Sequence, residues 1–296
     1  MILHNLNSLV KICHSSVRNN SFGQLKVVKV RSCDQLVFLF SASMVKAFSQ
    51  LVEIEVSKCG CMKTIMFVES TDIGKIFDEK IEFLPLRSLT LQHLPIIDYF
   101  CSHELTSSLG PTENLLRVNI STPFFSDKVK FSNLETLKLS SVNLKKIWDD
   151  SSAPYLVHNL ANLTVEDCSG LKYLFSSSMV GKLSNLKQLE ISKCDMMEEI
   201  IATEEINGVA VGEVLFPKLE AIIIEDMQSL KTIWHRILAS NSLACLKTLK
   251  VKNCEKIAFA TLETLKVEDC KSVQEIFQVG DNADDIPRDI VVWLVL

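Results

Sequence analysis

Short stretches of alternating apolar and polar residues recur along the whole chain. One copy, LKQLEISKCDMMEEI, starts at Leu186 and reads L-x-x-L-x-L-x-x-C-x-x-L-x-x-I. Its x-L-x-L core has the period of two that is typical of a short strand with one buried face. Further copies with the cysteine start at Leu25, Leu51, Leu160, Leu246 and Leu262, and copies with an apolar residue in its place start at Leu86, Leu134 and Leu219. A weaker copy starts at Leu115, and residues 3–14 form a truncated first unit.

The centres of the ten predicted strands are nearly regularly spaced. They are Val30, Val56, Leu91, Ile120, Leu139, Val165, Ile191, Ile224, Val251 and Val267. The steps between them are 26, 35, 29, 19, 26, 26, 33, 27 and 16 residues, which centre on the period of leucine-rich repeats. A single unit cannot bury its own leucines, so neighbouring units stack and share one core. We therefore predict an α/β leucine-rich-repeat solenoid (horseshoe) with a parallel concave β-sheet and irregular or short helical convex returns.

The predicted return of each unit is best seen in LFSSSMVGKLSNL, which starts at Leu174. Its residues Phe175, Met179, Val180 and Leu183 have roughly helical spacing. The stretch 171–194 is a near-copy of 36–59, at an offset of 135 positions, which indicates duplication of a block of several repeats. We predict one solenoid over residues 1–279 and an off-pattern tail over 280–296. The short last step and the lack of polar capping units lead us to expect a piece of a larger protein.

Composition narrows the class of protein. The net charge of −5 argues against a nucleic-acid surface, which needs a local excess of lysine and arginine. The chain does not open on a secretory signal, and its longest apolar run, 290–296, is far shorter than a membrane helix. Ten cysteines in such a chain are expected to stay reduced. We expect a cytoplasmic, or nucleo-cytoplasmic, protein with neither nucleic acid nor membrane as a partner.

Six cysteines occupy one position of the repeat, just after the strand: Cys33, Cys59, Cys168, Cys194, Cys254 and Cys270. Metal or disulfide chemistry is one reading of this column, and a small buried residue with a weak S–H donor is the other. Leu94, Val142 and Met227 fill the same position elsewhere, which favours the structural reading. The lone Cys59–Cys61 pair lacks partners at metal-ligand spacing.

Motifs of catalysis are missing from the sequence. The string Gly181-Lys182-Leu183-Ser184 lacks the upstream glycine of a phosphate-binding loop, since Ser176 stands there. No hydrolase or zinc-protease motif occurs. We therefore predict a protein that is not an enzyme and has no catalytic residue, no cofactor and no metal.

Binding is expected on the outward side of the strands and in two acidic insertions, 68–83 and 202–216. Opposite charges in neighbouring units, such as Lys29 with Glu55, should pair across strands. Part of the charge on this surface is therefore expected to be neutralised within the protein. Trp148 and Trp234 either cap the core or form an exposed ledge, and packing is favoured. The predicted partner-contact residues are Lys138, Thr164, Glu166, Asp167, Glu190, Lys193, Glu204, Glu205, Glu225 and Asp226.

Three segments resemble a known family: FSSSMVGKLSNLKQLEISKCDMMEEII, FPKLEAIIIEDMQSLKTIWH and TPFFSDKVKFSNLETLKLSSVNLKKIW. They are similar to the C-terminal repeats of plant nucleotide-binding leucine-rich-repeat disease-resistance proteins of the coiled-coil class. The resemblance covers residues 1–279. It implies a module that helps to hold a receptor inactive and to sense a pathogen effector or a modified host protein, with the receptor's own nucleotide-binding domain as a further partner. The ATPase switch of that family is not in this chain.

Two other functions stay open at this stage. Substrate-recruiting repeats of ubiquitin ligases also carry a cysteine in the turn, although an F-box is not found here. A decoy or non-functional fragment is the third reading, and the short step from Val251 to Val267 and the off-pattern tail support it.

Overall fold

The structure is a computed structural model, and it describes part of the chain in detail. The described residues are 1–13, 21–45, 47–68, 81–102, 122–149, 158–176, 178–202, 215–233, 242–254 and 256, with the backbone alone at 265–268 and 292–295. The chain forms two compact units. Residues 1–133 and 142–156 make the first unit, and residues 134–141 and 157–296 make the second.

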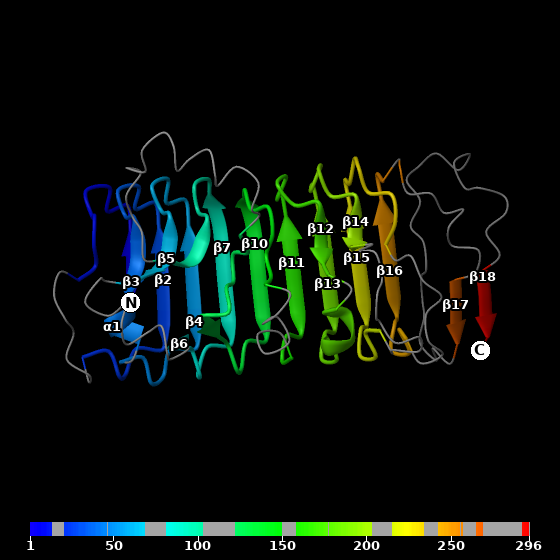
Figure 1. The fold of residues 1–296 in the computed structure, drawn as a ribbon, viewed down its shortest axis with the longest axis horizontal. Helices are drawn as coiled ribbons and strands as arrows, with labels where there is room; N and C mark the ends of the chain where they lie inside the picture. The colour runs from blue at the N-terminus through cyan, green and yellow to red at the C-terminus, as the bar shows by residue number, and fades with distance from the viewer. Residues whose placement is uncertain are drawn as a thin grey trace. The chain divides into compact units, whose positions relative to one another are not determined.

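The first unit is built on a parallel sheet of repeated strands (Figure 1). Its strands are β1 (Ile2–His4), β2 (Val27–Arg31), β4 (Glu53–Ser57) and β7 (Ser88–Leu94), in that order. Lys29 lies opposite Glu55, and Glu55 lies opposite Thr90, so the units stack in register. The flanking aliphatic residues, such as Val28 and Val30, are buried. The predicted alternation is confirmed because the apolar residues of each strand face one shared core.

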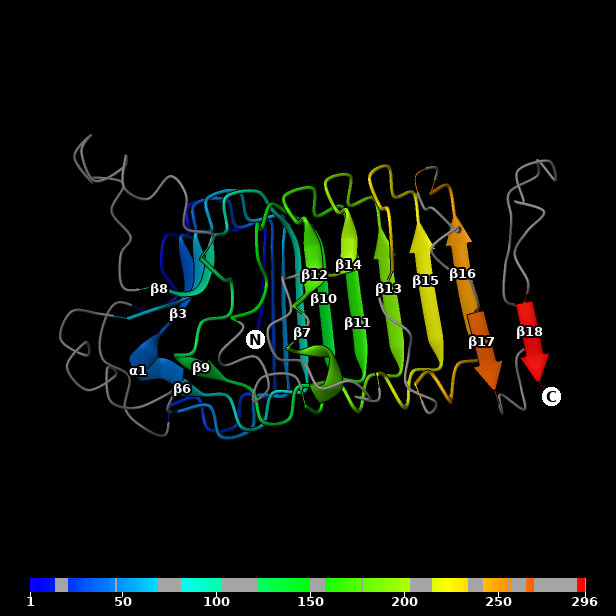
Figure 2. The ribbon, with the colours of Figure 1, turned by 45° about the vertical axis from the view of Figure 1, so that its right-hand side comes forward.

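A second set of strands, which the sequence pattern did not reveal, lies in the return segments (Figure 2). The strands β3 (Phe38–Ser41), β5 (Thr64–Phe67) and β8 (Tyr99–Ser102) form a three-stranded parallel sheet, and β6 (Ile81–Glu82) pairs with β9 (Val129–Lys130). Among the described residues of this unit, α1 (Ala42–Val45) is the one helix. Once the first strands are stacked, the returns are also stacked one coil apart, so their backbones can pair.

Aromatic side chains fill the end of the first unit's core. Phe100 lies 5.0 Å from Phe131 and 5.5 Å from Phe125 between ring centroids. Trp148 stacks on Phe125 at 5.4 Å and is only 3% exposed. Packing of Trp148 is therefore confirmed, whereas Trp234 lies outside the described residues.

The second unit repeats the same plan. Its parallel sheet has the order β10 (Thr136–Val142), β11 (Asn162–Glu166), β13 (Gln188–Ser192), β15 (Ala221–Glu225) and β16 (Thr248–Lys252). Within the described residues, nine of the ten predicted strand centres lie in strands, and the tenth, Ile120, is outside them. The prediction of a parallel-sheet leucine-rich-repeat solenoid is confirmed.

The return of the second unit is less helical than its spacing suggested. It contains β12 (Tyr173–Phe175), paired with β14 (Glu199–Ile201), and the short 3-10 helix η1 (Val180–Lys182). Leu174, Phe175, Met179, Val180 and Leu183 are all buried, as expected. Burial in the core needs only that these side chains point inward, so apolar spacing alone did not fix a helix.

The last strands depart from the repeat. Strand β17 (Leu265–Glu268) pairs with β18 (Val292–Val295) in a separate two-stranded parallel sheet and not with β16. Only 16 residues separate Val251 from Val267, against 26 in a standard coil.

Candidate interaction surface on the strands of the second unit

The outward positions of the second unit's strands form a polar surface in register. Its central column consists of Lys138, Thr164, Glu190, Ile223 and Lys250. All of these side chains are partly exposed, whereas their neighbours along each strand are buried, except Val251 next to Lys250. The structure therefore brings the predicted contact residues Lys138, Thr164 and Glu190 together on adjacent strands.

Hydrogen bonds link this surface from coil to coil. The Thr164 hydroxyl donates to Glu190 at 3.3 Å, and the Gln188 amide donates to the same carboxylate at 2.7 Å. Ser140 donates to Glu166 at 3.3 Å, across the strands β10 and β11. These bonds hold carboxylates in fixed positions without removing them from solvent.

Two ion pairs lie on this surface. Lys193 reaches Glu166 at 3.1 Å, and Lys250 reaches Glu225 at 2.7 Å. The pKa of Lys193 is raised, chiefly by its hydrogen bond with Glu166 and to a smaller extent by the charges of Asp226 and Asp167. Asp167 and Asp226 flank Lys193 along its own column, but its ion-pair partner, Glu166, lies on the neighbouring column. Exposed pairs of this kind contribute at most about 1 kcal/mol each.

The column that holds Lys193 has an unusual backbone. Its members in both units have φ between 51° and 56°, and they are Asn5, Ser32, Lys58, His93, Ser141, Asp167, Lys193, Asp226 and Asn253. In this left-handed conformation the backbone N–H of Lys193 donates to the backbone carbonyl of Glu225 at 3.1 Å. The backbone N–H of Asp226 donates to the backbone carbonyl of Lys252 at 2.9 Å. Asp167 accepts a hydrogen bond from Ser141 at 2.7 Å, and Asp226 accepts one from Asn253 at 2.8 Å. Asp167 and Asp226 are therefore part of a ladder as well as candidate contacts.

Ser141, Gln188 and Asn253 are not among the predicted partner-contact residues, although the repeat places Ser141 and Asn253 on an outward column. Each donates a hydrogen bond to a predicted acidic residue. The available signal was their place in the repeat, since each lies on an outward column beside a carboxylate. Glu204, Glu205 and most of the insertions 68–83 and 202–216 lie outside the described residues.

The cysteine column sits directly beneath this edge of the sheet. Cys33, Cys59, Cys168 and Cys194 are fully buried, and the Cys168 and Cys194 thiols each donate to a backbone carbonyl at 3.3 Å. Burial raises the pKa of Cys59, whereas hydrogen bonding with the Cys168 thiol lowers that of Cys194. Cys270 lies outside the described residues. The Cys254 thiol also donates to a backbone carbonyl, that of Lys252, at 3.2 Å, but this residue is only partly buried. The thiols thus bind backbone in the turn as predicted, whereas the predicted burial does not hold for Cys254.

Among the described residues, no group of three or more His, Cys, Asp or Glu side chains could hold a metal ion. Over the same ranges we find no helix with the length and hydrophobicity needed to cross a bilayer.

Comparison with known proteins decides the family. The family model for leucine-rich repeats described as plant disease resistance protein RPS2-like matches residues 1–122 and 133–258. The chain belongs to this family. Both units described above fall largely within the matched residues, so the stacked strands of each are leucine-rich repeats of the plant disease-resistance type.

Individual relatives from Arabidopsis thaliana agree with this assignment. The probable disease resistance protein At4g27220 is 30% identical over 129 residues, which are 43% of this chain and 14% of the relative. Disease resistance protein SUMM2 is 29% identical over 123 residues, and disease resistance protein RPS5 is 26% identical over 129 residues. These two matches cover 42% and 44% of this chain but only 12% and 14% of the relatives. No solved structure shows significant similarity.

Proposed function

We propose that this chain is a non-enzymatic recognition module of a plant intracellular immune receptor, and that the outward face of β10, β11, β13, β15 and β16 contacts its protein partner. The partner is a pathogen effector, a guarded host protein or the receptor's own nucleotide-binding domain, and the module acts in the cytoplasm. The family match favours this function over substrate recruitment by a ubiquitin ligase.

One observation carries the proposal. The inward residues of the five strands are uniformly aliphatic and buried: Leu137, Leu163, Leu189, Ile222 and Leu249. The outward column of the same strands changes from lysine to threonine, glutamate, isoleucine and lysine. The fold requires a buried aliphatic side chain at each inward position, but it does not require a particular residue type at the outward positions. The outward side chains are therefore available to specify a partner.

The side chains of this face favour a partner that presents charges of both signs. Glu190 is held by two hydrogen bonds, and Lys250 is held by Glu225. Fixed charges of this kind improve specificity and association rate more than they improve affinity. Ile223 provides an apolar position between them.

The test measures binding of this chain to the purified nucleotide-binding domain of a receptor from the same family. Glu190→Lys and Lys250→Glu reverse charges on the face and should each weaken binding about tenfold, mostly by slower association. Lys172→Glu changes an exposed lysine in the return segment and serves as the matched control. Equal binding by all three variants would contradict this role of the face, and absence of binding would rule out the nucleotide-binding domain as its partner.

A further inference from the structure

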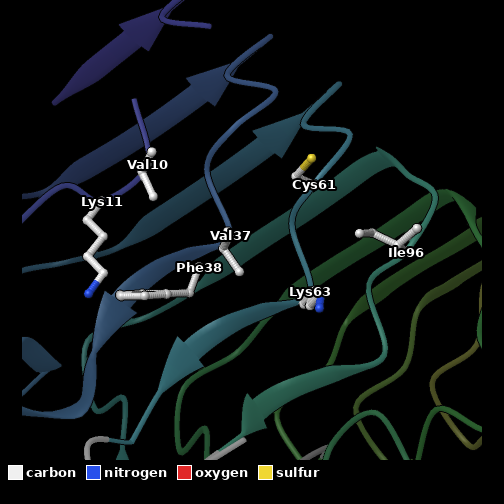
Figure 3. Close-up of a pocket in the computed structure, with 7 residues that line it drawn as sticks. All are labelled: Val10, Lys11, Val37, Phe38, Cys61, Lys63 and Ile96. Carbon is white, nitrogen blue, oxygen red and sulfur yellow. The ribbon is translucent and has the colours of Figure 1, made fainter. Parts of the chain in front are cut away.

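A groove in the first unit is lined by residues from four successive coils (Figure 3). Its volume is about 340 Å³, which is within the range of small binding clefts. Val10 and Lys11 come from the first coil, Val37 and Phe38 from the second, Cys61 and Lys63 from the third, and Ile96 from the fourth. The groove lies where the chain leaves the turn and starts the return, so it is separate from the outward face of the strands.

Apolar side chains form the floor and walls of this groove. The Phe38 ring is only 4% exposed and packs against Phe67 at 5.3 Å between centroids. Val10 and Ile96 are 49% and 43% exposed, which is high for large aliphatic residues. The lining is thus almost entirely apolar, with two lysines as its charged groups, which is the usual composition of a pocket that takes an apolar side chain.

The duplication inside the chain supplies a control for this observation. At the offset of 135 positions, Val10 corresponds to Lys145, Val37 to Lys172 and Lys63 to Glu198. The same repeat therefore folds with charged residues at these places, and Glu198 there forms an ion pair with Lys231. Packing of the coil does not require the valines, so their presence in the first block calls for another explanation.

The charges at the groove are cationic. Lys11 lies over the Phe38 ring, with its Nζ 5.8 Å from the centroid, and Lys63 lies on the third coil. No carboxylate is among the residues that line the groove. Asp98, on the fourth coil, lies outside that lining; burial raises its pKa, and the charges of Lys63 and Lys145 partly offset this effect. A ligand carboxylate near Lys63 would therefore compete with Asp98 for the attraction of this lysine.

We propose that this groove binds an acidic peptide segment of a protein partner. One large apolar side chain of the segment fills the space above Phe38, between Val10, Val37 and Ile96. Carboxylates on either side of that residue face Lys11 and Lys63. This is a second contact surface, independent of the one assigned to the strands.

The probe for this site is a fluorescein-labelled hexapeptide, EDLFDE, measured by fluorescence anisotropy with the full chain. We expect saturable binding that weakens about tenfold in Val37→Lys and in Lys63→Glu. Each of these changes introduces the residue that the second block carries at the same position, so the repeat should still fold. Asp98→Asn should tighten binding because it removes the competing carboxylate. Thermal unfolding of each variant checks that the fold is kept.

Matched peptides and a matched surface complete the test. KKLFKK, which reverses the charge, and EDSSDE, which lacks the apolar residues, should not bind. Glu190→Lys on the strand face should leave binding of EDLFDE unchanged. The peptide assay therefore tests the groove alone, and its outcome does not depend on whether the strand face binds the proposed partner. The proposal is overturned by absent binding, by binding that Val37→Lys and Lys63→Glu do not weaken, by preferential binding to phosphatidylserine vesicles, or by a concentration-dependent dimer that the same two variants abolish.

Discussion

The backbone N–H of Asp167 donates a hydrogen bond to the carbonyl of Ser192, one coil further along the second unit, at 2.9 Å. Asp167 makes this bond from the left-handed conformation, with φ of 51°. In the first unit Lys58 does the same, with φ of 55° and a 3.0 Å bond to Gln92. Each coil thus extends the sheet by one bond at a residue that has turned out of the strand.

Substitution of Lys58 should report the cost of that conformation. Lys58→Val should lower the free energy of unfolding by about 1–2 kcal/mol, because a β-branched side chain clashes in the left-handed region. Lys58→Gly should be neutral or slightly stabilising. Chemical denaturation measures both. Arg31→Val, at an exposed extended position, is the control and should change stability by less than about 0.5 kcal/mol.

Cys168 should tolerate loss of its sulfur but not a charge. Cys168→Ala removes a buried thiol and its hydrogen bond to the backbone carbonyl of Glu166. We therefore expect the free energy of unfolding to fall by about 1 kcal/mol. Cys168→Asp places a carboxylate at a fully buried position and should prevent folding of the second unit. Circular dichroism and denaturation distinguish the two. Equal tolerance of alanine and aspartate would show that the turn is open to solvent, contrary to the structure.

Stability should fall at acidic pH. The pKa of Glu82 is lowered from 4.5, chiefly by the hydrogen bond from Ser132 and next by the one from Lys130. In the same way, Lys231 lowers the pKa of Glu198, and Lys247 lowers the pKa of Glu220. Because these groups hold protons less tightly when folded, the unfolded chain binds more protons, and stability is lost as the pH drops below 4.5. Denaturation midpoints between about pH 6 and about pH 3.5 measure this loss.

Removal of one of these carboxylates tests the cause of the pH dependence. Glu82→Gln cannot titrate, so its stability should decline less steeply over the same pH range than that of the unchanged chain. Lys130→Met should flatten the decline in part, because Ser132 still holds the carboxylate. A stability that stays constant or rises on acidification would contradict the assignment of these three groups.

Alkylation should separate the cysteines by exposure. Cys245 is exposed and should react first with iodoacetamide at about pH 8. Burial raises the pKa of Cys101 to about 12, so its thiolate fraction is very small and it should react slowly. Cys33, Cys59, Cys168 and Cys194 should react only on unfolding. Peptide mass spectrometry measures the alkylation rate of each cysteine. As a control, Cys245→Ser should abolish the fast labelling of the peptide that contains residue 245. Fast labelling of Cys168 in the folded chain would contradict its burial.

The spacing of apolar residues by itself determined the strands, their register and the buried cysteine column. Leucines that recur at a fixed period can be buried only by stacking, so pattern alone led from LKQLEISKC to β13 beside β11 and β15. The outward columns followed, because side chains alternate along a strand. The sequence alone therefore places Lys138, Thr164 and Glu190 on the candidate face.

Tertiary structure alone decided how those residues interact. A lysine side chain is long enough to reach either of two neighbouring columns, and only the packed coils show that Lys193 meets Glu166. Ser32, Lys58, His93 and Asp167 have no common chemistry, so no local signal marks their left-handed backbone; the ladder to the next coil imposes it. The return strands likewise pair only once neighbouring coils are stacked. The groove above Phe38 exists only where four coils meet, because each coil contributes one or two residues and none forms the surface alone.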